Sequence, residues 1–116
     1  MTSNRPSPYT HIKEKIDKEY EAYIHKEKLK SSDNPFKLIN EISIKTKIKD
    51  YFANPTLYES ELSLLLEQDN IIEKTYQNYI KTAPKLFNNY PYPDDYYIVL
   101  AVKDIINEYI LSENNQ

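Results

Sequence analysis

The chain has no glycine, no cysteine and no tryptophan among its 116 residues, and it has only two histidines. Without glycine it cannot form the glycine-rich loops that hold phosphates in P-loop and dinucleotide-binding proteins. Without cysteine it has no disulfide framework, no thiolate zinc site and no thiol nucleophile. These absences exclude the commonest nucleotide-binding motifs and all thiol chemistry.

Long hydrophobic runs are also absent. No stretch of about 18 apolar residues could span a membrane, and the N-terminal MTSNRPSPYTHIKEK lacks the apolar core of a secretory signal. The length of 116 residues, with 40% hydrophobic and 28% charged residues, is typical of one globular domain. We therefore expect a cytoplasmic protein with a flexible tail at 1–6 and a single helical domain at 7–116.

Residues suited to catalysis are few and scattered. His11 and His25 lie in one predicted helix, about 21 Å apart along its axis, so they cannot share a metal ion within one chain. Asp104 and Glu108 share a helix face, but such acidic pairs are usually solvated. No serine lies in the sharp glycine-built turn that activated serines use. We expect no catalytic residue, no metal ion, no cofactor and no enzymatic activity.

Tyrosine is in excess, with 12 tyrosines and 3 phenylalanines making up the aromatic residues. Tyrosine combines a broad apolar ring with a hydroxyl, which suits half-buried positions and interfaces. Charge is uneven as well: residues 1–50 hold 11 Lys/Arg and 8 Asp/Glu, a net of +3, whereas residues 51–116 hold 4 and 10, a net of −6. An acidic, tyrosine-rich half is typical of a surface that meets a basic partner, or of solvated helix faces.

Two cap-and-proline signals, Ser7-Pro8 and Asn34-Pro35, each predict the start of a helix. The first helix is expected at about 8–29 and the second from 35 up to Asn54-Pro55. Further helices are expected around the leucine run at 57–66, after Asn70 with Glu73 in capping-box spacing, and from 94 or 95 onward. The last is apolar nearly all round, which predicts a central helix. The fold class is thus all-α, a compact bundle of four to five helices.

One segment fits two periods. Ile42, Ile44, Thr46 and Ile48 alternate with polar residues, as in a lysine-fringed strand, although the whole run from 35 also fits a helix. YYIVLAV, residues 96–102, could likewise be a buried strand. The alternative fold is therefore α+β, with a small sheet from 42–49 and 96–102.

Three stretches resemble an uncharacterised family of low-GC Gram-positive bacteria, their phages and mobile elements. They are KIDKEYEAYI at 15–24, NPFKLINEISIKTKIKDYF at 34–52 and LLLEQDNIIEKTYQNYIK at 64–81. The resemblance brings no assigned activity and no site residue. It implies a small phage or mobile-element protein, a group in which inhibitors of host defence, such as anti-CRISPR proteins, are frequent.

The stretch NNYPYPDDYY, residues 88–97, is the candidate partner-binding site. Pre-ordered aromatic rings lose little entropy on binding, and the flanking acids would select a basic surface. The alternative is that these tyrosines only fold the loop onto the bundle. The predicted contact residues are Tyr90, Tyr92, Asp94, Asp95, Tyr96 and Tyr97. The expected function is non-catalytic inhibition of a host protein with a basic surface, a Cas effector being one example.

Two other functions stay open. A small DNA-binding regulator would use the basic segment 37–52, in which Lys45, Lys47 and Lys49 lie beside two aromatic residues. In a helix, however, Lys47 points away from the other two, and the acidic half repels phosphate, so direct nucleic-acid binding is not expected. The chain could also be a structural or interaction module, and a homodimer is compatible with the same tyrosines.

Overall fold

The structure, a computed structural model, describes residues 7–28, 35–83, 85–86, 90–91 and 95–114. The predicted tail at 1–6 lies outside these residues, as do Tyr92 and Asp94. Five helices account for most of the described chain, which confirms the all-α class. They are α1 (Pro8–Lys28), α2 (Pro35–Ala53), α3 (Glu59–Leu66), α4 (Ile71–Thr82) and α5 (Asp95–Asn114).

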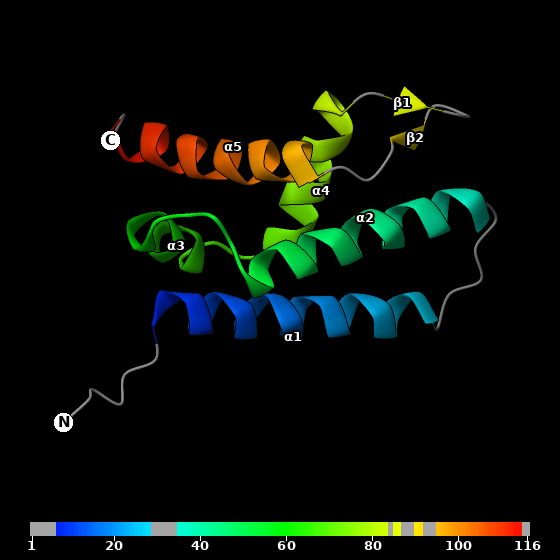
Figure 1. Ribbon diagram of the computed structural model, residues 1–116, viewed down its shortest axis with the longest axis horizontal. Coiled ribbons are helices and arrows are strands. Elements are labelled where there is room, and N and C mark those ends of the chain that lie inside the picture. The colour runs from blue at the N-terminus through cyan, green and yellow to red at the C-terminus, as the bar shows by residue number, and fades with distance from the viewer. Residues whose placement is uncertain (1–6, 29–34, 84, 87–89, 92–94, 115–116) are drawn as a thin grey trace.

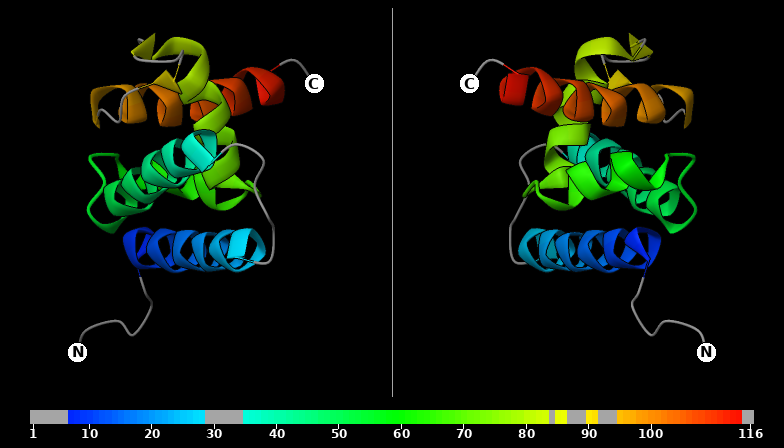
Figure 2. Two further views of the ribbon diagram at one scale, coloured as in Figure 1. Left: turned by 90° about the vertical axis from the view of Figure 1, so that its right-hand side faces the viewer. Right: turned by 90° about the vertical axis from the view of Figure 1, so that its left-hand side faces the viewer.

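The helices form three levels (Figure 1). α1 lies at the bottom, α2 and α3 lie above it, and α5 lies at the top, while α4 runs steeply from the level of α2 up to α5. The two side views in Figure 2 show the same order of levels. α4 contacts α1, α2 and α5, so it touches helices of all three levels.

All five helices contribute to one hydrophobic core. Fully buried side chains include Ile12 and Ile16 of α1, Phe52 of α2, Leu62 of α3 and Tyr79 of α4. α5 adds Ile98, Ala101 and Val102 from its inner face. Because each helix places apolar residues three and four positions apart, each presents one continuous stripe to this core. In the leucine run at 57–66, Leu57, Leu62 and Leu65 are buried and Leu66 packs against the core.

The strand alternative for 42–49 is wrong, because this segment lies within α2. Ile44, Ile48 and Phe52 are fully buried at a spacing of four, whereas Ile42, which shares their alternating pattern, is half-buried. The segment is helical because the helix start at Pro35 is followed by core residues at a spacing of four. Residues 96–102 lie within α5, so the second half of the suggested sheet is wrong too.

A short β-ladder does occur, but elsewhere. β1 (Lys85–Leu86) pairs antiparallel with β2 (Tyr90–Pro91), with Leu86 opposite Tyr90. The ladder contacts the bundle where β2 meets α2.

The last helix is not central, contrary to expectation. α5 occupies the top level (Figure 1), and several of its apolar residues are exposed, among them Leu100 and Leu111. A helix that is apolar all round can be buried all round only if neighbours surround it. Here α2, α3 and α4 pack against one side of α5, and the opposite side faces outward.

Asn70 ends the turn between α3 and α4 in the left-handed region, with φ 56°. In a chain without glycine, asparagine is the residue that adopts this conformation most readily. The predicted capping box of Asn70 and Glu73 is wrong, since the Asn70 side chain makes no cap hydrogen bond. A distant residue acts instead: the Ile72 N–H donates to Glu19 Oε1 of α1 at 2.9 Å, so an acid from another helix stabilises the start of α4.

Candidate binding surfaces

The beginning of α5 carries three of the predicted contact residues. Asp95 and Tyr96 are exposed, with Tyr96 63% accessible, whereas Tyr97 packs against the core. The two tyrosine rings meet edge to face, with centroids 5.2 Å apart. Asp95 Oδ1 lies 3.7 Å from the ammonium of Lys47 on α2, an exposed pair that contributes little to stability. Tyr97 therefore anchors the beginning of α5 in the core, whereas Tyr96 faces solvent.

The other three predicted contact residues are Tyr90, Tyr92 and Asp94. Tyr90 lies in β2, where its backbone pairs with Leu86. Tyr92 and Asp94 fall outside the described residues. The structure thus brings Asp95 and Tyr96 together on the surface and leaves the contribution of the other tyrosines of the stretch a prediction.

Tyr96 also begins a longer exposed face on α5, which sequence reasoning missed. We call it the outward face of α5. Its members follow helical spacing along the side turned away from α2, α3 and α4, and they are Tyr96, Leu100, Lys103, Asn107, Ile110 and Leu111. Its ends are apolar and its middle is polar. The 4-3-4-3 spacing from Tyr96 to Ile110 is the spacing of a helix–helix seam, and this signal was present in the sequence.

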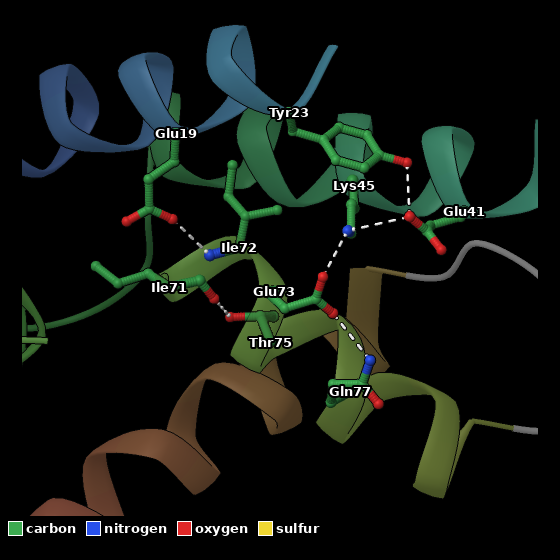
Figure 3. A network of polar contacts seen from close by, with 9 residues as sticks. All are labelled: Glu19, Tyr23, Glu41, Lys45, Ile71, Ile72, Glu73, Thr75 and Gln77. Atoms are coloured by element: carbon green, nitrogen blue, oxygen red, sulfur yellow. Dashed lines mark hydrogen bonds and ion pairs between the residues drawn. The ribbon is translucent and has the colours of Figure 1, made fainter. Parts of the chain in front are cut away.

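A second notable region surrounds Lys45 (Figure 3). Lys45 is only 2% exposed, and its ammonium donates to Glu41 Oε2 at 3.2 Å and to Glu73 Oε1 at 3.0 Å. It also lies 4.0 Å from the ring centroid of Tyr23 and 5.0 Å from that of Tyr76. Two carboxylates and two aromatic faces thus replace the water that a buried ammonium loses. This cluster joins α1, α2 and α4.

The surroundings of this cluster shift the pKa values of two of its residues, Glu73 and Tyr23. Burial raises the pKa of Glu73, but hydrogen bonds from Gln77 and Lys45, together with the positive charges of Lys45 and Lys26, outweigh it and hold the pKa below its usual range. Burial, with the hydrogen bond that its hydroxyl donates to Glu41 at 2.8 Å, raises the pKa of Tyr23 well above its usual range. The cluster therefore favours ionised Glu73 and neutral Tyr23.

A groove of about 460 Å³ opens beside the cluster, between α1 and α4. Its walls include Glu19, Lys26, Lys45 and Glu73. Glu19, Lys45 and Glu73 already make hydrogen bonds within the protein. The groove is therefore the outer edge of a structural network rather than a set of groups awaiting a ligand.

Burial of Lys45 corrects the candidate nucleic-acid contact. The ammonium of Lys45 faces the protein interior, Lys47 is exposed next to Asp95, and Lys49 lies 5.3 Å from the ring centroid of Tyr20. A phosphate-binding surface needs several accessible cations. The three lysines do not form one, although they divide between two faces of the helix as the helical interpretation predicted.

Four tyrosines, two on α1 and two on α4, lie at helical spacing and are partly or fully buried. Tyr76 and Tyr79 are buried, while Tyr20 and Tyr23 are half-buried. The Tyr20 hydroxyl lies 2.8 Å from Thr46 Oγ1, so rings pack inside and hydroxyls find partners at the rim.

Other tyrosines lie near residues 54–58. The Tyr9 hydroxyl donates to the Leu57 carbonyl at 2.8 Å, and the Tyr51 hydroxyl accepts from the Thr56 N–H at 3.3 Å. Tyr58 is 78% exposed. At the other end of α5, Tyr109 donates to Glu67, and this bond raises the pKa of Tyr109 to about 12. Three of these tyrosines thus join separate segments through hydrogen bonds of their hydroxyls: Tyr9, Tyr51 and Tyr109. The ring of Tyr58 is exposed to solvent.

Within the described part of the chain, no three His, Asp or Glu side chains are grouped closely enough to hold a metal ion. No helix among the described residues is long and apolar enough to cross a bilayer. Comparison of the chain with protein-family models, with curated protein sequences and with solved structures found no match. The family resemblance of the three sequence stretches therefore stays a prediction.

Proposed function

We propose that this protein acts without catalysis, by binding another protein through the start of α5. The observation that supports this proposal is the exposure of Asp95 and Tyr96 side by side at the beginning of α5. Tyr96 offers a large ring held against its neighbour Tyr97, which is itself anchored in the core. A ring fixed in this way loses little conformational entropy on binding, as interface hot spots require.

The proposed partner has a basic surface. Residues 51–116 carry a net charge of −6, and α3 contacts α5, so the exposed acids of these two helices lie on neighbouring elements. They include Glu59 and Glu67 near α3 and Asp104 and Glu108 on α5. Such a field speeds the encounter with a positively charged protein and repels nucleic acid.

The finer proposal is inhibition of a host defence protein that binds nucleic acid, in the manner of an anti-CRISPR protein encoded by a phage or mobile element. An acidic inhibitor would compete with nucleic acid for the basic channel of its target. Because the whole chain has a net charge of only −3, charge alone would be a weak competitor. Local contacts from Asp95 and Tyr96 would have to supply most of the affinity.

The test is capture of partners from host lysate by the immobilised protein, followed by quantitative mass spectrometry. The wild type is compared with Asp95→Lys and with Tyr96→Ala, after circular dichroism has shown that both variants fold. Tyr58→Ala is the matched control, since Tyr58 is also an exposed tyrosine but lies before α3. We expect a basic partner whose capture falls at least about tenfold in Asp95→Lys, because a charge pair becomes a repulsion.

The purified partner then completes the test. The wild type should displace nucleic acid from it, and Asp95→Lys should fail to do so at the same concentration. A partner that is captured equally by wild type and Asp95→Lys would contradict the assigned surface. A captured partner whose nucleic-acid binding is unaffected would contradict the inhibitor proposal.

A further inference from the structure

We infer that the outward face of α5 is the contact surface between two copies of this chain, packed with their α5 helices antiparallel. This inference goes beyond the proposed function, with which it shares one residue, Tyr96. It rests on the exposed apolar residues of the face, on their helical spacing and on the order of charged and polar residues between them.

The exposed apolar residues are concentrated at the two ends of the face. Tyr96 is 63% and Leu100 37% exposed at the beginning of α5, and Ile110 is 41% and Leu111 61% exposed near its end. No other helix contributes two such pairs to a single face; this holds for the described residues 7–28, 35–83 and 95–114. A face of this kind is satisfied by a partner helix with the same spacing of apolar residues.

An antiparallel partner with a twofold axis near the middle of the helix supplies that spacing. The Tyr96 and Leu100 end of one copy then meets the Ile110 and Leu111 end of the second copy, and the same contact occurs twice. A twofold interface must be self-complementary in this sense. The face meets the requirement because its apolar groups lie on both sides of a polar centre.

The polar centre sets the direction of the two helices. In the antiparallel arrangement, Lys103 of each copy lies beside Asp104 and Asn107 of the other copy, where it finds a carboxylate and an amide oxygen. In a parallel arrangement, Lys103 would lie beside Lys103, and the repulsion would have no compensation. The exposed neighbours Lys103 and Asp104 thus favour one orientation, as polar seam positions do in coiled coils.

The contact is small. A single helix pair buries less than the roughly 1,200–2,000 Å² that stable complexes bury in total. We therefore expect a weak dimer that forms at high protein concentration and dissociates on dilution.

Sedimentation equilibrium of the full chain tests the inference. Between about 10 µM and about 1 mM, the range in which small interfaces associate, the mean mass should rise from the monomer mass of 13.8 kDa toward twice that value. Leu111→Asp should hold the mass at that of the monomer throughout the range. Tyr58→Asp, which places the same charge at another exposed site, should dimerise like the wild type.

A charge exchange tests the orientation. Lys103→Glu alone should weaken association at least about fivefold, because it creates acid–acid contacts in the antiparallel pair. Combined with Asp104→Lys, it should recover association, since the two opposite charges face each other again. Circular dichroism at low concentration shows whether each variant is folded, and any variant that is not folded is replaced by its Gln or Asn counterpart.

Three outcomes would overturn the inference. They are a constant monomer mass for the wild type, a dimer that persists in Leu111→Asp, and a double exchange that fails to recover association. Asp95→Lys separates this inference from the proposed function, because Asp95 lies beside the outward face. It should lose the basic partner and keep the dimer, whereas Leu111→Asp should lose the dimer and keep the partner.

Discussion

The Lys45 cluster and the outward face of α5 reverse the usual placement of residues in opposite ways. At the first, a charged lysine is 2% exposed among three helices. At the second, a tyrosine and a leucine are each more than 60% exposed on one helix, Tyr96 at 63% and Leu111 at 61%. Burying a charge and exposing large apolar groups are both unfavourable, so each region needs a reason.

The difference between them is the presence of compensating groups. The ammonium of Lys45 has two carboxylates and two aromatic rings around it, so the unfavourable burial is balanced inside the chain. Leu111, at one end of the outward face, keeps 61% of its surface exposed instead. A buried charge that is compensated by groups of the same chain stabilises the fold. A face of large apolar side chains that stays exposed indicates an interaction with another molecule.

Removing the buried ammonium should have the largest effect on stability. Lys45→Ala would leave Glu41 and Glu73 facing each other without their shared cation and would open a cavity. We expect the free energy of unfolding to fall by about 3–5 kcal/mol. Urea denaturation followed by circular dichroism measures it.

Lys47→Ala is the matched control on the same helix, because the Lys47–Asp95 pair is exposed. Its effect should be within about 0.5 kcal/mol. A loss of less than about 1 kcal/mol in Lys45→Ala, the upper end for an exposed ion pair, would show that the cluster is not an integral part of the fold.

The two faces of α5 provide the next comparison. Ile98 is fully buried and Leu111 is 61% exposed. Ile98→Ala should lower the free energy of unfolding by about 2–5 kcal/mol, because it removes packed methyl groups and leaves a cavity. Leu111→Ala should change it by less than about 0.5 kcal/mol when measured on the dilute monomer. Equal losses would mean that Leu111 is packed against the bundle, and the outward face would not be a free surface.

The smallest effect concerns acid stability. The folded-state pKa of Glu73 is depressed, so its contribution to stability is present above the unfolded pKa of about 4.3 and is lost as the pH falls through the folded pKa. The urea midpoint of the wild type, measured from pH 7 to pH 3, should fall as the pH drops below about 4.3. The urea midpoint of Glu73→Gln should fall less over the same range. Glu59→Gln, which alters an exposed acid on α3, is the control. Identical acid profiles for wild type and Glu73→Gln would contradict this linkage.

Much of the architecture could be predicted from local signals. Prolines at 8 and 35 marked the starts of α1 and α2, and four-residue apolar spacing identified the core side of each helix. The position of α5 could not be predicted in this way. Periodicity reports which residues are apolar, but it does not report how many sides of a helix its neighbours cover.

The burial of the candidate contact residues could be predicted only in part, and their role in binding stays a prediction. Tyr97 was grouped with Asp95 and Tyr96 as a contact residue, but it packs against the core whereas the other two are exposed. One position along a helix turns a side chain by about 100°, so adjacent tyrosines in one motif fall on different sides. Lys45 was misjudged for a related reason, since its partner Glu73 lies 28 residues away in the sequence.

The sequence by itself determined the helical class, the absence of glycine- and cysteine-dependent chemistry and the uneven distribution of charge. Those properties follow from composition and from contacts within three or four residues. Only the tertiary structure decided that Lys45 is buried, that Glu19 stabilises the start of α4 and that one side of α5 remains exposed. Each of these depends on which distant segments meet, and such pairing is set by packing the whole core at once rather than by any local pattern.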